Sequence, residues 1–401
     1  MKTVVKALLI AITFFSLSNV HAQTWTYHNA GTVGFIMSIS FPTNDSGYVV
    51  TDYGQIRKTF DGALTWSGVT QPPTPVYSVL FLTGQTGFAF GDSTVYKTNN
   101  AGATWTPVLS PGGVFFRNMH FPNSTTGYLT AEKTTGDSIR LFKTTNGGIT
   151  WSQVARKRYY LLDCGLYFLN STEGFWSTDF EIYSTTNGGM SFSNSYSDIS
   201  QAQTFVNYSF PSIDTGYSLD YAALVRTYNG GATWTEVNIP AQVTYDLYFS
   251  TGEKGFICGG NMNGWIAETA DAGMTWTTAY STPYVLVCMD FPSDFVGYSG
   301  GQNGTVIKYS GTITAIEPEQ NESSISIYPN PTTNGRVIIE AGKRTCDKLE
   351  IYNSVGQMVQ EQALLADESN QVVVEGLDAG IYYVRVLFED GEWGVKELVV
   401  L

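Results

Sequence analysis

Few residues of this chain have the types and spacing that metal or nucleophilic chemistry requires. His28 and His120 are the histidines outside the first 22 residues, and neither has a cysteine or a carboxylate at the spacing of a metal-ligand set. The chain has no His-Glu-x-x-His, no Gly-Lys phosphate loop and no Gly-x-Ser-x-Gly elbow. We therefore predict no metal, no cofactor and no catalytic residue.

Paired carboxylates are the remaining catalytic possibility. Glycoside hydrolysis needs two of them across a cleft, at separations of roughly 5 to 9.5 Å. A convergent pair with a raised pKa would favour hydrolysis, whereas a flat aromatic face without such a pair would favour binding. The acids expected on one face of the fold are Asp52, Asp92, Glu132, Asp137, Asp179 and Asp220.

One basic and aromatic run stands out in an acidic chain. Arg156 and Arg158 flank Lys157 and are followed by Tyr159 and Tyr160. Such a run could hold the carboxylate or phosphate of a sugar, and a solvated loop is the alternative. Arg156 and Arg158 are therefore candidate ligand-binding residues.

The elements that would position these residues come from a repeat of about 40 residues. The clearest copy is the box from Thr144 to Trp151, Thr-Thr-Asn-Gly-Gly-Ile-Thr-Trp, and related endings recur along the chain. A second marker is a phenylalanine followed six residues later by glycine and an aromatic residue. This marker occurs at Phe41, Phe81, Phe121, Phe168, Phe210, Phe249 and Phe291. A period of this length, built from short apolar runs and glycine-rich turns, is typical of a β-propeller.

The phase of the repeat predicts how the ring closes. Each unit has four strands, except that the last one, Met289 to Tyr309, has three and no box. The first strand, Thr24 to Tyr27, has the ending of a box and no blade before it. We therefore predict an all-β fold, a seven-bladed β-propeller in which the N-terminal strand completes the last blade and removes two open sheet edges.

The boxes have a structural explanation. Their Asp or Asn side chains can bond the backbone N–H groups of their own turn, and the glycine two residues later suits a positive φ angle. Ala63 replaces that glycine in the first box, so its turn is expected to be strained or different. The residues assigned to this role are Asp61, Asn100, Asn146, Asn187, Asn229 and Asp271.

Aromatic residues recur near the start of the repeats, on the face opposite the boxes. A ring of them around a central channel would suit sugar or peptide recognition, and the alternative is that they fill the channel as core. Trp265, in a long loop, is a candidate platform. The candidate ligand-binding aromatics are Tyr77, Phe116, Tyr160, Tyr245 and Tyr284.

The box spacing, Ser/Thr-x-Asp-x-Gly-x-Thr-Trp, resembles the Asp-box (BNR-like) repeat of sialidases, sortilin-type receptors, some glucan hydrolases and photosystem II assembly factors. The resemblance covers roughly residues 24 to 310 and implies the propeller fold. In sialidases the box lies away from the active site. Phe116-Arg117-Asn118-Met119 is a poor match to their Phe-Arg-Ile-Pro motif.

The two ends of the chain indicate export. Residues 1–22 combine Lys2 and Lys6 with a short apolar stretch and Val20-His21-Ala22, as in a cleavable signal peptide. No later apolar run is long enough to cross a bilayer. Residues 23–310 would then be the propeller, and the polar residues 311–324 a linker.

Residues 325–401 are predicted to form a small immunoglobulin-like β-sandwich. This region resembles the type A C-terminal sorting domain of the type IX secretion system of Bacteroidota. The resemblance implies passage through that translocon, followed by removal of the domain and release or surface attachment. The motif residues that carry it are Tyr328, Pro329, Asn330, Pro331, Gly356, Gly380, Tyr382, Lys396 and Leu398.

The net charge of the chain is consistent with export and disfavours some classes of partner. The chain has 21 basic and 35 acidic side chains, a formal net charge of −14, which repels nucleic acid and anionic membranes. Two small buried thiols, Cys258 and Cys288, are favoured over a bridge between them. We predict a secreted or surface-displayed module that binds a glycan or a protein without catalysis. A glycoside hydrolase and an assembly or adhesion factor are the alternatives.

Overall fold

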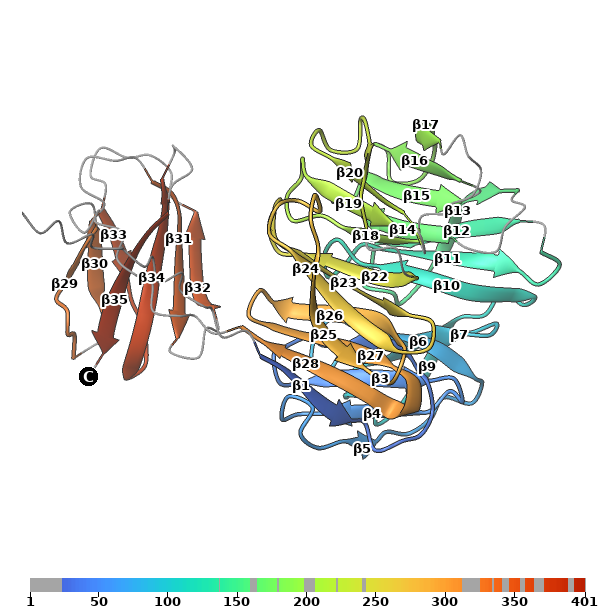
Figure 1. Cartoon of the computed structure of the whole chain (residues 1–401), viewed down its shortest axis with the longest axis horizontal. Coiled ribbons are helices and arrows are strands. Elements are labelled where there is room, and N and C mark those ends of the chain that lie inside the picture. The colour runs from blue at the N-terminus through green and yellow to red at the C-terminus, as the bar shows by residue number, and fades with distance from the viewer. Residues whose placement is uncertain are drawn as a thin grey trace, which may run out of the picture. The chain divides into compact units, whose positions relative to one another are not determined.

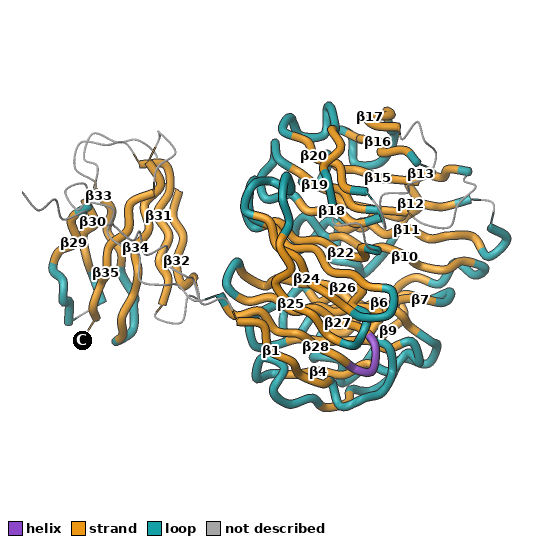
Figure 2. The backbone as a smooth tube through the Cα atoms, in the orientation of Figure 1, coloured by secondary structure: helices purple, strands orange, loops and turns teal. Residues whose placement is uncertain are grey.

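The computed structural model describes residues 24–136, 138–158, 164–178, 180–197, 206–220, 223–239, 243–311, 325–333, 335–340, 346–353, 358–363, 371–388 and 393–400. The chain divides into two compact units, Gln23–Ser310 and one that includes Gly311–Leu401. Figure 2 shows strands joined by loops almost throughout, with one short 3-10 helix, η1 (Gln302–Gly304). The predicted all-β class is confirmed.

Seven four-stranded antiparallel sheets lie in the described part of Gln23–Ser310, which confirms four strands per repeat. The first four are β2 (Ile36–Ser40) to β5 (Ser67–Gly68), β6 (Val76–Phe81) to β9 (Thr106–Leu109), β10 (Val114–His120) to β13 (Ser152–Lys157), and β14 (Cys164–Phe168) to β17 (Ser193–Ser197). The next three are β18 (Asn207–Ser209) to β21 (Thr235–Val237), β22 (Thr244–Phe249) to β25 (Thr277–Thr282), and β26 (Leu286–Ser293), β27 (Val296–Gly301), β28 (Thr305–Ser310) and β1 (Thr24–Asn29). Their inner pairs are β3 (Gly47–Thr51) and β4 (Ile56–Thr59), β7 (Gly87–Gly91) and β8 (Val95–Thr98), β11 (Gly127–Lys133) and β12 (Ile139–Thr144), β15 (Gly174–Thr178) and β16 (Glu181–Thr185), β19 (Gly216–Leu219) and β20 (Leu224–Thr227), and β23 (Gly255–Gly260) and β24 (Gly264–Thr269).

The first strand of each sheet contacts the first strand of the next. These contacts run from β2 through β6, β10, β14, β18 and β22 to β26, and β26 contacts β2. Figure 1 shows the same order by colour, with the orange strands β26 to β28 returning beside the blue N-terminal strands. The sheets are therefore arranged as in a β-propeller.

The N-terminal strand β1 pairs with β28, the last strand of the same unit. The pairing is antiparallel from Thr24 opposite Ser310 to Asn29 opposite Thr305. Trp25 lies with its ring 4.9 Å from that of Tyr309 and packs in the core next to Phe256. The two ends of the unit are thus held in one sheet.

The spacing between the marker phenylalanine and glycine has a steric cause. A Cβ placed on Gly47 would clash with the ring of Phe41, 2.2 Å from its nearest atom. The glycine and phenylalanine of each of the other six repeats show the same clash. The phenylalanine ring therefore lies flat on the glycine of its own sheet. Any larger residue at the glycine would displace the ring.

The aromatic residue after each glycine stacks on the marker phenylalanine of the following sheet. Tyr48 lies on Phe81 with ring centroids 3.3 Å apart, and Tyr298 of the last sheet lies on Phe41 of the first at 3.5 Å. The intermediate pairs are Phe88–Phe121, Tyr128–Phe168, Phe175–Phe210, Tyr217–Phe249 and Phe256–Phe291. One stacked pair thus joins every neighbouring pair of sheets.

The box turns share one hydrogen-bond pattern. In the first box, Asp61 Oδ1 accepts the backbone N–H of Thr65 at 2.9 Å, and Thr59 Oγ1 accepts that of Ala63 at 3.1 Å. Ala63 has φ 72°, in the same left-handed region as Gly102 at 79°. The first turn therefore keeps the common shape, with an alanine in a conformation that favours glycine.

The second unit contains two sheets that share one core. The first consists of β29 (Ser326–Tyr328), β30 (Val337–Glu340) and β33 (Gln371–Val374). The second consists of β32 (Met358–Ala363), β31 (Cys346–Asn353), β34 (Gly380–Phe388) and β35 (Trp393–Val400). Ile339 of the first sheet and Leu349 and Val384 of the second are buried together.

Candidate functional site

The predicted ligand-binding aromatics differ widely in exposure. Tyr77 is 37% exposed on β6, whereas Tyr245 and Tyr284 are half-buried near the starts of the sixth and seventh sheets. Phe116 is 4% exposed and packs edge-on against Phe142. Tyr160 lies outside the described residues.

Trp265 is part of the core rather than an open platform. Its side chain is 5% exposed and packs with Leu247 and Ile257. Gly259, opposite it on β23, leaves room for the indole because it has no side chain. Trp265 therefore lies on a strand, β24, rather than in the predicted long loop, and its packing on Gly259 buries the indole.

The residues on either side of the predicted Phe116 face solvent. Phe115 and Arg117, which flank Phe116 on β10, have exposed side chains. With Met37 on β2 and Tyr77 on β6 they form what we call the inner-strand group, because all four lie on the consecutive first strands β2, β6 and β10. Met37 is 45% exposed. This group joins apolar, aromatic and cationic side chains on adjoining strands.

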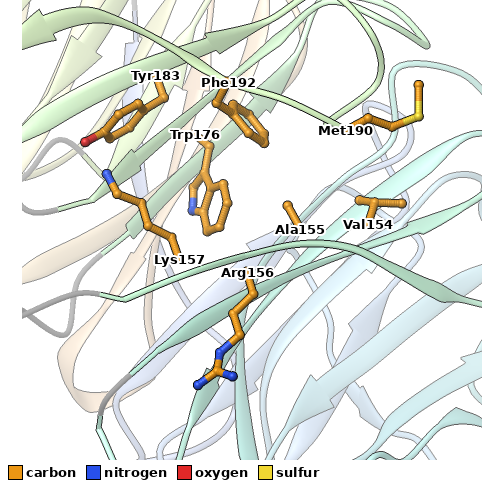
Figure 3. Close-up of a pocket in the computed structure, with 8 residues that line it drawn as sticks. All are labelled: Val154, Ala155, Arg156, Lys157, Trp176, Tyr183, Met190 and Phe192. Atoms are coloured by element: carbon orange, nitrogen blue, oxygen red, sulfur yellow. The ribbon is translucent and has the colours of Figure 1, made fainter.

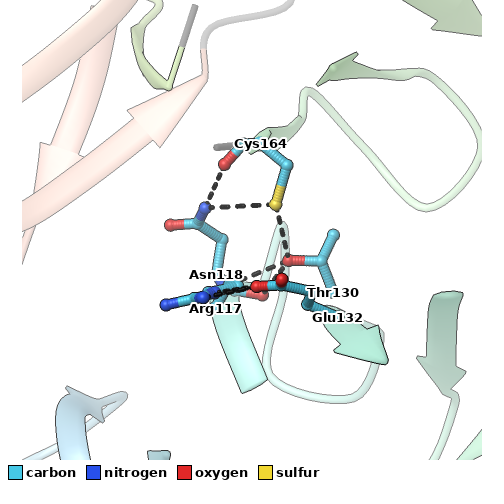
Figure 4. A network of polar contacts seen from close by, with 5 residues as sticks. All are labelled: Arg117, Asn118, Thr130, Glu132 and Cys164. Carbon is cyan, nitrogen blue, oxygen red and sulfur yellow. Dashed lines mark hydrogen bonds and ion pairs between the residues drawn. The ribbon is translucent and has the colours of Figure 1, made fainter. Parts of the chain in front are cut away.

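A polar network fixes Arg117 in this group (Figure 4). Its guanidinium forms an ion pair with Glu132, a buried carboxylate on β11, with Nε 2.8 Å from Oε2. The next residue, Asn118, donates from its amide to the carbonyl of Cys164 on the following sheet. Thr130 Oγ1 accepts the backbone N–H of Asn118 at 3.1 Å. Arg117 is thus paired with a carboxylate of its own sheet, which matches its charge, and Asn118 links the same strand to the following sheet.

A pocket of about 400 Å³ lies between the outer strand β13 and the following sheet. We call it the seam pocket. It is lined by Val154, Ala155, Arg156, Lys157, Trp176, Tyr183, Met190 and Phe192 (Figure 3).

Of the two predicted basic residues, Arg156 borders the seam pocket, but its guanidinium extends away from the aromatic side chains (Figure 3). Arg158 is exposed just past β13. Lys157 is the cation on the aromatic side, with Nζ 3.2 Å from the centroid of the Tyr183 ring and 3.5 Å from Glu181 Oε2. Two departures from the repeat could have indicated this pocket and were missed: Phe192 stands in place of the box tryptophan, and Trp176 stands two residues after a strand glycine.

Two carboxyl groups have raised pKa values, and both hold neighbouring sheets together. Burial raises the pKa of Asp246 to about 7, and its Oδ2 accepts the backbone N–H of Met289 at 2.7 Å. Burial likewise raises the pKa of Asp290 to about 6, and its Oδ2 accepts the N–H of Phe41 at 2.5 Å. Neither is among the acids predicted from sequence.

Of the acids predicted for hydrolysis, Asp52 and Glu132 have partners within the propeller unit, Asp92 is half-buried and Asp220 is 4% exposed. Asp52 Oδ1 accepts the N–H of Phe35 at 2.9 Å, and Glu132 pairs with Arg117. Asp137 and Asp179 are outside the described part of the chain. No group of three or more His, Cys, Asp or Glu side chains suited to a metal occurs among the described residues. Cys164, Cys258 and Cys288 are buried.

The motif residues of the C-terminal unit converge on its last strand. Asn330 Oδ1 accepts the backbone N–H of Val399 at 2.9 Å, and the N–H of Thr332 bonds the carbonyl of Val399. Leu398 is fully buried and Tyr382 nearly so, whereas Tyr328 is 40% exposed. Lys396 and Gly380 are half-buried, Pro329 and Pro331 are exposed, and Gly356 lies outside the described residues.

Residues 326–400 match the family of secretion system C-terminal sorting domains. This segment is thus a type IX sorting domain, and it indicates that the protein is secreted to the cell surface or beyond. No helix in the described residues is long and apolar enough to cross a membrane.

Solved structures similar to the chain are β-propellers or propeller-like. YCF48 bound to D1 peptide has a TM-score of 0.58 and 18% identity, covering 72% of this chain and 97% of that one. YCF48 from Cyanidioschyzon merolae gives 0.56 and 15%, covering 71% and 98%. The WD40 β-propeller domain of Doa1 gives 0.54 and 10%, covering 72% and 98%. At these identities the likeness shows the fold.

One curated relative also matches. Ulvan lyase NLR42 from Nonlabens ulvanivorans is 28% identical over 81 residues, which is 20% of this chain. The chain spans 15% of the length of that relative.

Proposed function

We propose that this protein is a type IX secretion cargo whose propeller binds a glycan or protein partner without catalysis. Residues 1–22 serve as the signal peptide, 23–310 as a seven-bladed propeller closed by β1, and 311–324 as a linker. The C-terminal domain, an immunoglobulin-like sandwich, engages the translocon and is then removed. The Asp-boxes stabilise the turns of the propeller.

The observation that supports ligand binding is the inner-strand group. Phe115 and Tyr77 are each 37% exposed, and the guanidinium of Arg117 lies 5.8 Å from the centroid of the Phe115 ring, with its charge matched by Glu132. Exposed aromatic side chains beside a fixed arginine suit stacking on a sugar or on a peptide side chain. A structure of the YCF48 propeller holds a D1 peptide, so the fold is compatible with a peptide ligand.

Catalysis is disfavoured by what the raised-pKa carboxyls do. Asp246 and Asp290 each accept a backbone N–H from the neighbouring sheet, which gives both carboxyl groups a structural role. A general acid must reach its substrate oxygen. The match to an ulvan lyase covers one fifth of the chain, and we do not carry that activity over.

The binding proposal is tested with the secreted protein on a panel of immobilised polysaccharides, measuring retention and released reducing ends in the same samples. Retention without release, weakened at least about tenfold by Tyr77→Ala, is expected. Tyr228→Ala is the matched control, because Tyr228 is 55% exposed beside a box turn. Release of reducing ends would establish a hydrolase instead, and retention unchanged by Tyr77→Ala would refute the site.

The export proposal is tested separately in a bacterium that has the type IX system. Removal of residues 325–401 should leave the propeller in the periplasm. A reporter carrying those residues should reach the medium or the cell surface. Secretion of the truncated chain would contradict the proposal.

A further inference from the structure

We propose that Asp92 is a cation-binding position within the inner-strand group, and that the ligand it selects is a glycan carrying protonated amino groups. The inference rests on the proposed function and deepens it, because it names the ligand of the same surface. Three features support it: the partners of three equivalent acids, the strand register around Phe115, and the exposure of two neighbouring aromatic rings.

An acid stands five residues after the strand glycine in each of the first three repeats, and these acids differ in their partners. Asp52 Oδ1 accepts the backbone N–H of Phe35 at 2.9 Å. Glu132 forms the ion pair with Arg117 (Figure 4). The side chain of Asp92, the acid of the second repeat, has no hydrogen bond or ion pair with any described residue. One of the three equivalent carboxylates thus lacks a partner in the described part of the chain.

The sequence of the second repeat explains why Asp92 has no partner. Phe35, the donor in the first repeat, stands six residues before the marker phenylalanine, where the second repeat has Pro75. Proline has no backbone N–H. Arg117 stands four residues before its marker phenylalanine, where the second repeat has the uncharged Tyr77. The second repeat therefore has the acid without either kind of donor.

Asp92 lies beside an aromatic ring that already carries one cation. An antiparallel bridge places Asp92 opposite Phe115, and on its other side Phe115 is opposite Glu132. Residues directly opposite on antiparallel strands have Cβ atoms about 5 Å apart on the same face. Phe115 is therefore flanked by two carboxylates. Glu132 holds Arg117, whose guanidinium lies 5.8 Å from the centroid of the Phe115 ring. A ligand cation at Asp92 would reproduce this arrangement on the other side of Phe115.

A ligand can reach both aromatic neighbours of Asp92. Tyr77 and Phe115 are each 37% exposed. Tyr77 packs on Gly91, the residue before Asp92, because a Cβ on that glycine would lie 2.9 Å from Tyr77 Cδ2. Asp92 itself is half-buried, and its carboxylate oxygens are accessible to solvent. One ligand can therefore contact the carboxylate and the rings beside it.

These groups suit an amino sugar. Aromatic faces stack on the apolar face of a pyranose ring, and an ammonium group is attracted to a nearby aromatic ring. A hydrogen bond from an ammonium to a carboxylate is roughly twice as strong as one between neutral groups. Arg117 does not oppose the ammonium, because its charge is matched by Glu132. A uronate would be repelled by Asp92 and by the net charge of −14.

The size of the inner-strand group favours a glycan over a protein surface. Its four side chains are each less than half exposed. A stable protein interface buries roughly 800 Å² on each partner, whereas a pyranose ring needs only one or two aromatic faces. A peptide that presents an arginine is the competing occupant, and the test includes it.

Two ligands that differ only in N-acetylation test the site. Calorimetric titration of the secreted protein would compare the glucosamine tetramer with the N-acetylglucosamine tetramer, at a pH where the amines are protonated. We expect the wild type to bind the glucosamine tetramer at least about tenfold more tightly. Asp92→Asn keeps the shape, removes the charge and should abolish this preference. Asp214→Asn is the matched control and should not change it, because Asp214 is exposed beside the box turn of the fifth repeat.

A second variant, Pro75→Ala, leaves Asp92 in place and gives the second repeat the backbone N–H that Phe35 provides in the first. Asp92 should then accept that N–H, and the preference for the glucosamine tetramer should fall at least about threefold. This variant decides the matter if Asp92→Asn does not fold.

Equal binding of the two tetramers, a preference that Asp92→Asn leaves unchanged, or no binding of either tetramer would overturn this inference. In each case, polysaccharide retention that is weakened by Tyr77→Ala would still uphold the proposed function. Binding of an arginine-bearing peptide that depends on Asp92, without binding of the glucosamine tetramer, would also overturn the inference and would assign the surface to a protein partner.

Discussion

The ring of Tyr298, in the last sheet of the propeller unit, lies on the ring of Phe41 in the first, with centroids 3.5 Å apart and planes at 7°. Its hydroxyl donates to the carbonyl of Asn44 at 2.6 Å. The same pair of contacts joins the first and second sheets, where Tyr48 stacks on Phe81 and donates to the carbonyl of Gly84 at 2.9 Å. The seam between the ends of the unit is therefore built like an internal seam.

This likeness predicts equal costs for two variants. Tyr298→Phe and Tyr48→Phe each remove one hydroxyl and leave the stacked ring in place. Each should lower the free energy of unfolding by about 1 kcal/mol, as for a typical hydrogen bond. Denaturant unfolding of both variants checks this. A cost at Tyr48 with none at Tyr298 would mean that the last seam is open in solution.

Two box glycines with nearly the same backbone separate conformational strain from crowding. Gly102 has φ 79° and Gly148 has φ 76°. A Cβ on Gly102 would lie 3.2 Å from Val69, whereas one on Gly148 would meet the ring of Phe88 closer than atoms can pack. Gly102→Ala should cost about 1 kcal/mol, for a left-handed alanine.

Gly148→Ala should cost about 2 kcal/mol more, because the Phe88 ring must move within a packed core. Thermal and denaturant unfolding of the two variants gives the comparison. Ala63, which occupies the corresponding turn position at φ 72°, shows that the backbone accepts alanine. Equal costs for the two variants would place the whole effect in the backbone.

The sequence predicts the sheets well because the same few residues have the same tasks in every copy. Gly47 must lack a side chain because the ring of Phe41 lies on it, and Asp61 must bond the N–H groups of its turn. Residues with these two tasks therefore recur in the sequence once per repeat. The exposed aromatic side chains of the proposed ligand site are harder to predict. Strands alternate their faces, and a register shift between Phe116 and Met119 lies within β10, so a choice wrong by one residue exchanges buried Phe116 for exposed Phe115.

The seam pocket could be predicted only in part. Phe192 in place of a tryptophan and the extra Trp176 are both visible as departures from the repeat. The space beside Trp176 and Phe192 depends on how two whole sheets pack. No local pattern in the sequence encodes that volume.

The buried carboxyl of Asp290 predicts a pH-dependent stability. Its pKa in the folded protein is about 6, above the value near 4 of an unfolded aspartate, so between these pH values the folded state binds more protons. The contribution of Asp290 to the free energy of unfolding is therefore complete below about pH 4, and it is lost as the pH rises through about 6. Over the whole of this pH range the wild type should lose up to about 3 kcal/mol from this group.

Asp290→Ser is the matched variant for that effect. Ser40 and Ser209 stand at the same repeat position and accept the N–H of Phe81 and Phe249, each at 2.9 Å. Serine should thus keep an acceptor for Phe41 and remove the titration. Unfolding free energies at pH 5 and pH 8 should differ less in the variant. An unchanged difference would place the pH dependence elsewhere, with Asp246 the next group to change.

The first box predicts the opposite pH behaviour at lower pH. Hydrogen bonds from the Thr65 hydroxyl and backbone lower the pKa of Asp61 to about 2, so its contribution is present above about pH 4 and is lost as the pH falls through about 2. Thr65→Val removes the hydroxyl donor to Oδ2 and should raise the pKa of Asp61 toward 4. Carboxyl carbon shifts followed by NMR measure this directly.

Asp271 is the control. Its pKa is also lowered by its own threonine, and it should not change in the Thr65→Val variant, because its partner Thr275 is intact. Since four of the six boxes have asparagine, Asp61→Asn should keep the turn and abolish this titration. A pKa of Asp61 that stays near 2 without the Thr65 hydroxyl would show that the backbone N–H groups of the turn are sufficient to hold the carboxylate.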